Sequence, residues 1–328
     1  MSHIPVLLGE VLRALKPAQG ETYLDGTFGA GGYTKAVLGA ADCHVIGLDR
    51  DPNVQPHVDE VAAEFGERFS FVQSEFSGME AAIGGKQIHG VVLDIGVSSM
   101  QLDQGVRGFS FMREGPLDMR MSGRGVSAAD AISLLEHNEL IQIFKVYGEE
   151  RRARRCADFI VRAREQGAVT TTLALAEIIS SALGRQGKNH PATRVFQALR
   201  IYVNDELGEL YRALLAAEKI LHPGGRLIVV TFHSLEDRIV KSFFRARSGE
   251  VAGSSRHLPP QAVSENAPSF KLTRRSGIAP SKQEQKDNKR ARSARLRYGI
   301  RTNAPVWSEP ENLLSDVPSL EALKRRAA

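Results

Sequence analysis

The sequence contains little cysteine, few aromatic residues and no long apolar run. Cys43 and Cys156 are the only cysteines among 328 residues, which excludes a disulfide framework and a cysteine-rich zinc site. No apolar stretch approaches the roughly 18 residues that a helix needs to span a bilayer. The first residues, Met-Ser-His-Ile-Pro, have neither the basic nor the apolar segment of a secretory signal. We therefore expect a cytoplasmic chain that binds no metal and has no membrane span.

Basic residues outnumber acidic ones, and the excess is concentrated in two places. The whole chain has a net charge of +5. The window 282–301 holds eight basic and two acidic residues, and the window 145–164 holds seven and three. Such clusters are typical of polyanion binding, although one alone also fits a solvated face. The candidate RNA contacts are Arg151, Arg152, Arg154, Arg155, Lys289, Arg290, Arg292 and Arg295.

The first hundred residues alternate short apolar runs with segments of helical spacing. The runs are Thr22–Asp25, His44–Asp49, Arg68–Val72 and Gly90–Asp94, and the helical segments are 31–40, 53–65 and 77–84. This alternation predicts an α/β fold with a parallel sheet that is buried on both faces. A later strand is expected at Arg226–Thr231, after His222–Gly225 ends a helix. Phe270–Arg274 and Ala294–Ile300 predict a final antiparallel pair.

The middle of the chain is helical. Ser127 and Asp130 predict a capping box, and Thr172 predicts the N-cap of a helix that ends at Gly184. Leu140, Ile143, Phe144 and Tyr147 form an apolar stripe of helical spacing. Apolar residues from Phe196 to Leu214 predict one long helix. Nine Ser, Gly or Pro in the stretch 248–268 predict a surface loop. We expect a discontinuous sheet domain of residues 1–107 and 194–328, with an inserted helical domain at 108–193.

A glycine-rich segment, residues 24–33, follows the first strand. Glycines let a ligand approach the backbone, and the following helix presents free N–H groups. A dinucleotide motif needs a third glycine where this chain has Thr34, so that interpretation is weakened. Asp25, Asp49 and Asp94 each end a predicted strand. Carboxylates suit the sulfonium and ammonium groups of S-adenosylmethionine, and Asp49 is placed to accept two ribose hydroxyls. One such aspartate is usually a helix cap, but three beside this turn favour that cofactor.

Several longer motifs resemble the bacterial ribosomal RNA small subunit methyltransferase H family. They are Asp25–Gly32, Asp49–Pro52, Leu93–Asp103, Arg107–Phe111, Pro116–Arg120, His190–Arg200, Phe232–Asp237 and Asn288–Ala294. The resemblance extends from His3 to about Arg297. It implies a Rossmann-like class I methyltransferase sheet in which the helical insert recognises the substrate. It also implies transfer of a methyl group from S-adenosylmethionine to the exocyclic N4 of a cytidine in the decoding region of 16S rRNA.

The resemblance and the glycine-rich turn together select the expected cofactor contacts. These are Asp25, Gly29, Gly31, Gly32, Tyr33, Asp49, Phe76, Asp94 and Gln101. Where this chain has Tyr33, the family usually has histidine. Asp94 is the main catalytic candidate, in direct contact with the amine or through the cofactor. Asp118, His190 and His233 are weaker candidates, and a cap at a helix start is the simpler role for His190.

Other interpretations remain open. Residues 94–99 lack the Pro-Pro pair of general amino-methyltransferase motifs. Phe109, Phe111 and Met112 fit equally well stacking on a flipped base or packing within the fold. The chain is alternatively a methyltransferase for another RNA, or an RNA-binding assembly factor without catalysis. The expected partner is small-subunit rRNA or the 30S particle, and both a monomer and a homodimer fit.

Overall fold

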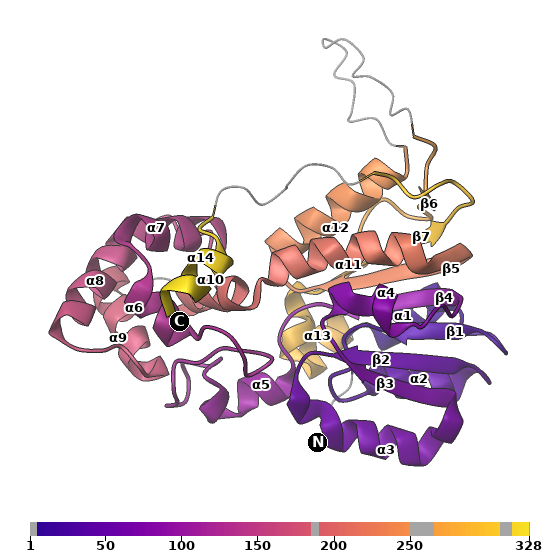
Figure 1. Cartoon of the computed structure of the whole chain (residues 1–328), viewed down its shortest axis with the longest axis horizontal. Coiled ribbons are helices and arrows are strands. Elements are labelled where there is room, and N and C mark those ends of the chain that lie inside the picture. The colour runs from indigo at the N-terminus through magenta and orange to yellow at the C-terminus, as the bar shows by residue number, and fades with distance from the viewer. Residues whose placement is uncertain (1–4, 185–189, 250–265, 309–316, 328) are drawn as a thin grey trace, which may run out of the picture. The chain divides into compact units, whose positions relative to one another are not determined.

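The chain folds into two compact units (Figure 1). The computed structural model describes residues 5–184, 190–249, 266–308 and 317–327. The first unit comprises Met1–Gly96 and Glu209–Pro310, and the second comprises Val97–Gly208 and Glu311–Ala328. The second unit therefore extends beyond the predicted insert of 108–193 on both sides. One reason is that helix α10, Thr193–Asn204, packs on helices of that unit, α6 (Ala128–Leu134) and α7 (His137–Val146).

The first unit is built on a seven-stranded sheet in the order β3-β2-β1-β4-β5-β7-β6. The strands are β1 Thr22–Asp25, β2 His44–Asp49, β3 Phe69–Gln73, β4 Ile88–Asp94, β5 Leu221–Thr231, β6 Phe270–Lys271 and β7 Arg295–Arg301. The first five form parallel pairs, and β7 is antiparallel to both β5 and β6. This arrangement confirms the predicted Rossmann-like methyltransferase sheet and its final antiparallel pair.

One helix of the first unit precedes β1, and the others lie between the strands in sequence. They are α1 Leu8–Leu15, α2 Gly32–Ala40, α3 Gln55–Phe65, α4 Met79–Ala82, α11 Glu206–Ile220, α12 Ser234–Arg247 and α13 Lys282–Asp287, and α11 begins at the boundary between the units. Apolar side chains of β1, β2, β4 and β5 share one core with residues of α4, α11 and α12. Because the strands are buried, their ends are held in fixed register, which positions the residues that follow them.

Strand β5 starts earlier than expected. Leu221 pairs with Ile88, and the pairing resumes with Arg226 opposite Gly90. The His222–Gly225 turn is therefore an irregularity within β5, and the preceding helix α11 ends before this turn, at Ile220. Most of the predicted loop at 248–268 lies outside the described residues.

The second unit is helical, as predicted. Besides α6, α7 and α10 it contains α5 Ser99–Asp103, α8 Ala153–Gln166, α9 Thr172–Leu183 and α14 Leu320–Ala327. The capping box of Ser127 and Asp130 is present at the start of α6. The stripe on α7 is buried, with Leu140, Ile143 and Phe144 fully covered. None of the described helices in either unit is long and apolar enough to cross a membrane.

Two helix predictions in this unit are wrong in detail. The N-cap of α9 is Thr171, whose side chain accepts a hydrogen bond from the Ala174 N–H. The Thr172 hydroxyl instead donates to the Arg113 carbonyl at 2.9 Å and accepts from the Gly115 N–H at 3.2 Å. The single helix expected from Phe196 to Leu214 is broken at Asp205, whose φ of 47° is left-handed, so α10 and α11 are separate.

Candidate active site

Three aspartates end neighbouring strands of the sheet. Asp25 ends β1, and its register partners are Gly47 on β2 and Val92 on β4. Asp49 and Asp94 therefore each lie two residues further along their strands, about 7 Å beyond Asp25. Strand β1 ends two residues before its neighbours β2 and β4. The turn after Asp25 therefore lies between the ends of β2 and β4, at the carboxyl edge where open α/β sheets bind ligands.

The turn after β1 is tied to both neighbouring strands. The Gly26 N–H donates to the Val92 carbonyl at 2.9 Å, and the Phe28 N–H donates to the Leu48 carbonyl at 2.8 Å. Gly31 precedes α2 with a φ of 73°, and a Cβ there would lie 3.0 Å from atoms of Phe28 and Val61. The turn therefore needs glycine for its packing, independently of any ligand.

Asp25 is buried, with 3% of its surface exposed. Its carboxylate accepts hydrogen bonds from the Thr34 hydroxyl at 2.8 Å and the Thr27 N–H at 3.2 Å. Burial raises the pKa of Asp25 to about 6, and the charge of Asp49 adds to the rise. Thr34, which breaks the dinucleotide motif, is therefore a hydrogen-bonding partner of this carboxylate.

Asp49 is half-buried and holds two backbone donors. One carboxylate oxygen accepts from the Gly29 N–H and the other from the Asp51 N–H, both at 2.8 Å. Burial raises its pKa to about 6 even though these bonds favour the charged form. Each oxygen has a second lone pair, so the carboxylate can also accept from two adjacent hydroxyls.

Asp94 has a buried carboxylate oxygen, Oδ1, with no hydrogen-bond partner among the described residues. Its backbone N–H donates to the Thr27 hydroxyl at 2.7 Å, which fixes the end of β4. Burial, followed by the charges of Asp25 and Glu236, raises the pKa of Asp94 well above its usual value, and the nearby Tyr33 hydroxyl offsets part of the rise. Buried polar atoms in native proteins are nearly always paired, so this oxygen points to a ligand.

Tyr33 and Phe76 complete the surroundings of the turn. Tyr33 is buried on α2, and its hydroxyl donates to the Val6 carbonyl. Phe76 is half-buried in the short 3₁₀ helix η3, Phe76–Gly78, which follows β3. A Cβ added at Gly26 would lie 3.4 Å from the Phe76 Cβ, so this ring flanks the turn.

These residues fit S-adenosylmethionine, the cofactor that the sequence implies. Asp49 offers paired acceptors for ribose hydroxyls, and Phe76 offers an apolar surface for a base. Burial raises the pKa values of Asp25 and Asp94; the charge of Asp49 adds to the rise at Asp25, and the charge of Asp25 adds to the rise at Asp94. A cation bound beside them would lower those pKa values and compensate their charge.

Gln101 belongs to the second unit. It is buried, and its side-chain oxygen accepts from the Ser98 N–H at 3.0 Å. The Gln101 N–H in turn donates to the Ser98 hydroxyl, which completes a capping box at the start of α5. Its part in cofactor binding stays a prediction, and the side chain has a structural role besides.

The geometry weighs against two of the weaker catalytic candidates. Asp118 forms a two-pronged ion pair with Arg120, at 2.9 and 2.6 Å. Burial opposes ionisation of Asp118, but these bonds outweigh it and hold its pKa below the usual value. The His190 Nδ1 accepts from the Ala192 N–H, and the exposed His190 ring stacks on Phe111 at 4.6 Å. Asp118 is therefore a poor base. His190 is not the cap of α10, whose N-cap is Ala192 without a side-chain cap bond; it accepts a hydrogen bond in the turn just before that helix.

His233 lies at the start of α12, in the first unit. Its Nε2 lies 2.9 Å from the Glu236 carboxylate, which is fully buried. The other Glu236 oxygen accepts from the Phe232 and His233 N–H groups, at 2.7 and 3.1 Å. Sequence reasoning missed this role of Glu236, and it missed Thr27, which bonds both Asp25 and Asp94. The signal for both was their place within the long motifs.

The candidate RNA contacts differ in how they are used locally. Arg152 donates to the Leu183 carbonyl at 3.0 Å, and Arg155 donates to the Ala182 carbonyl. Both therefore satisfy carbonyls at the end of α9. Arg151 and Arg154 are exposed, as are the candidates of the other cluster, Lys289, Arg290, Arg292 and Arg295.

The aromatic candidates mostly serve packing. Phe109 is buried, and Phe111 lies between His190 and Phe196, with its ring 5.1 Å from that of Phe196. Met112 is 77% exposed. Of the three residues that sequence analysis considered for base stacking, Met112 alone presents most of its surface to solvent.

Comparison with known proteins extends over nearly the whole chain. Residues 1–301 match the model of the MraW methylase family. Three curated relatives share the name Ribosomal RNA small subunit methyltransferase H. The protein of Maricaulis maris (strain MCS10) is 54% identical over 98% of this chain and 98% of its own length. That of Caulobacter vibrioides (strain NA1000 / CB15N) is 56% identical over 93% and 97%, and that of Brucella canis (strain ATCC 23365 / NCTC 10854 / RM-666) is 52% identical over 98% and 95%.

Proposed function

This chain belongs to the MraW methylase family, and from that premise we propose that it methylates the exocyclic N4 of a cytidine in the decoding region of small-subunit rRNA. Its activity is methyl transfer, and its cofactor is S-adenosylmethionine. The names of its relatives support the RNA substrate. We also propose that it acts in the cytoplasm, where bacterial ribosomal subunits are assembled.

The observation behind the proposed chemistry is the unpaired carboxylate oxygen of Asp94. The N4 lone pair of cytosine is delocalised into the ring, so this amine is a poor nucleophile. An acceptor for one amine hydrogen favours a pyramidal nitrogen and stabilises the positive charge that develops on it. Asp94 Oδ1 is buried at the edge of the sheet and accepts no hydrogen bond from the described residues.

The reaction needs positioning and one proton acceptor. The bound cofactor supplies an electrophilic methyl group on sulfur. Transfer of that methyl group to the amine nitrogen would release one amine proton and leave the sulfur as a neutral thioether. In this proposal Asp94 accepts that proton directly or through water, while Asp49 orients the ribose. Holding the amine about 3–3.5 Å from the methyl carbon contributes much of the rate.

The cofactor contacts are part of the proposal. In the first unit they are Asp25, Gly29, Gly31, Gly32, Tyr33, Asp49, Phe76 and Asp94, and Gln101 is the contact from the second unit. Exposed members of the two basic clusters bind phosphates of the substrate. The partner is small-subunit rRNA, either free or within the 30S particle.

Replacement of Asp94 tests the chemistry. Asp94→Ala and Asp94→Asn are expected to lower turnover by at least about 100-fold, because they remove the acceptor for the amine proton. Tritium transfer from labelled cofactor to small-subunit particles measures turnover, and mass spectrometry of the rRNA locates the product. Asp118→Asn is the matched control, and we expect it to retain turnover. Full activity in Asp94→Ala would exclude the proposed role of this residue.

The same mapping tests the substrate. A cytidine methylated on N4 should be absent from small-subunit rRNA of cells lacking the gene, and purified protein should restore it. Methylation found only on tRNA, or cofactor binding without turnover on any particle, would contradict the proposed function.

A further inference from the structure

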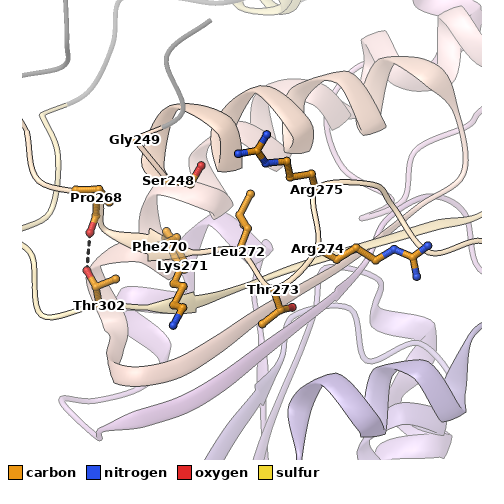
Figure 2. Close-up of a pocket in the computed structure, with 10 residues that line it drawn as sticks. All are labelled: Ser248, Gly249, Pro268, Phe270, Lys271, Leu272, Thr273, Arg274, Arg275 and Thr302. Carbon is orange, nitrogen blue, oxygen red and sulfur yellow. Dashed lines mark hydrogen bonds between the residues drawn. The ribbon is translucent and has the colours of Figure 1, made fainter. Parts of the chain in front are cut away.

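Two adjoining cavities form a basic groove at the β6 edge of the sheet. The larger, shown in Figure 2, has a volume of about 690 Å³. Both are lined by Leu272, Arg274 and Arg275, which follow β6. Helix α12 forms the other side, with Lys241 and Arg245 lining the smaller cavity and Ser248 the larger. We call this feature the edge groove. It belongs wholly to the first unit.

The charge of the edge groove has one sign. Its basic residues are Lys241, Arg245, Lys271, Arg274, Arg275 and Arg297, and no acidic residue is among the described residues that line it. Arg297 is neutralised by a two-pronged bond to Asp237. Within the described parts of the chain, Lys241, Arg245 and Lys271 have no carboxylate within ion-pair distance. The groove therefore presents uncompensated positive charge to solvent.

Protection of an exposed sheet edge does not account for this pattern. Lysine on an edge strand discourages pairing with other chains, and that explains Lys271 on β6. Lys241 and Arg245 lie instead on a helix, four residues apart, so they share one face. Between them the Phe244 ring is buried and contacts Phe270, with ring centres 5.6 Å apart. The packing fixes the helix so that this face borders the groove.

We propose that the edge groove binds the sugar-phosphate backbone of the RNA substrate, away from the methylated base. Arginine guanidinium groups match phosphate oxygens in geometry, and a concave basic lining with ring surface from Tyr298 suits a single strand. The strand order places β6 three strand spacings, about 14 Å, from β4, and the register places Lys271 level with Gly90, four residues before Asp94. The RNA segment held there is therefore a flanking one. Its identity as rRNA rests on the proposed function.

A lipid surface fits the groove less well than RNA does. Membrane-surface sites combine basic residues with exposed apolar side chains that insert between lipids. The large hydrophobic residues that are well exposed in the described structure are Val106, Met112 and Val306, and none of them lines the groove.

Salt-dependent binding tests the proposal. The variant combines Lys241→Gln, Arg245→Gln and Arg274→Gln, and the control combines Arg13→Gln, Lys86→Gln and Lys219→Gln, which removes equal charge from the same unit. Binding of full-length protein to a small-subunit rRNA transcript, and to poly-uridine, is followed by anisotropy between about 50 and 200 mM KCl. Each lost phosphate contact reduces the slope of log affinity against log salt by about 0.7, so the variant should lose about 2 and the control almost nothing.

The outcomes separate this proposal from the proposed function. If the triple variant had the same salt slope as the control, the proposed RNA binding by the edge groove would be wrong. It would also be wrong if the triple variant bound phosphatidylglycerol vesicles more weakly while its RNA binding was unchanged. Lys241→Arg with Arg245→Lys keeps both charges and should keep the slope, which would assign the effect to charge. Cofactor affinity by calorimetry should be unchanged in the triple variant. If the wild-type protein methylates no rRNA but the salt slopes of the triple variant and the control differ as expected, the proposed function is wrong and the proposed RNA binding by the edge groove still holds.

Discussion

Asp25 illustrates a conflict between binding and stability at one residue. Burial raises its pKa from 3.8 to about 6, so the folded state holds a proton more tightly than the unfolded chain. Stability from this group is full below about pH 4 and is lost as the pH rises through about 6. The rise corresponds to about 3 kcal/mol lost at neutral pH in the cofactor-free protein.

Asp25→Asn should therefore stabilise the cofactor-free protein at high pH. The amide retains an oxygen for the Thr27 N–H, and the Thr34 hydroxyl can accept from its NH₂ group. We expect a higher melting temperature than wild type at pH 8 and little difference near pH 4. Calorimetry should show weaker cofactor binding in the same variant. A variant that is less stable than wild type at pH 8 would contradict the assignment of the pKa shift.

The Tyr33 hydroxyl lowers the pKa of Asp94, against the larger rise caused by burial. Tyr33→Phe removes this hydroxyl, so the pKa of Asp94 should rise further. If Asp94 must be ionised for turnover, the acid limb of the pH–rate profile moves to higher pH. Tyr23→Phe, at another buried tyrosine, is the control and should leave the limb in place. An unchanged profile in Tyr33→Phe would show that the two groups are not coupled.

At the scale of elements, the turn before α2 depends on Gly31. Its φ is 73°, and a Cβ would lie 3.0 Å from both Phe28 and Val61. Gly31→Ala should cost about 1–3 kcal/mol of folding stability, through backbone strain and overpacking. Gly39, inside α2, has nothing within 4 Å of an added Cβ, so Gly39→Ala should gain about 0.5–1 kcal/mol. Urea unfolding measures both, and equal effects of the two substitutions would refute the argument.

Helices and strands could be predicted from the sequence where local sequence patterns agree with the burial seen in the structure. The runs at 22–25 and 44–49 are β1 and β2 to the residue, because each is apolar and ends in a strand-tip aspartate. Prediction from the sequence failed where tertiary contacts decide. Thr171 and Thr172 are equivalent as caps in sequence, and only the hydrogen bonds of Thr172 to the 113–115 segment separate them. Asp205 breaks a helix that its apolar spacing would continue.

The candidate site was predictable for a similar reason. Strand-tip carboxylates and a glycine-rich turn are local patterns, so Asp25, Asp49 and Asp94 could be named from sequence. Their raised pKa values depend on burial by distant segments, which no local pattern shows. The bond from the Asp94 N–H to the Thr27 hydroxyl likewise depends on the register of β1 and β4.

At the scale of the whole molecule, the two basic clusters belong to different units. Arg151 and Arg154 lie in the helical unit, and Lys289 and Arg292 lie in the sheet unit. All four are exposed. Two units that bind one RNA contribute separate sets of phosphate contacts, and their effects on affinity should add when the sites do not touch.

The additivity can be measured with two paired variants and their combination. Arg151→Gln with Arg154→Gln, and Lys289→Gln with Arg292→Gln, should each reduce the salt slope for rRNA binding by about 1.4, because each removes two phosphate contacts. The fourfold variant should lose about 2.8, and its free-energy change should equal the sum of the pairs within about 0.5 kcal/mol. Loss of slope from one pair alone would place the RNA on a single unit. A combined effect far from the sum would mean that the clusters interact, since independent phosphate contacts add.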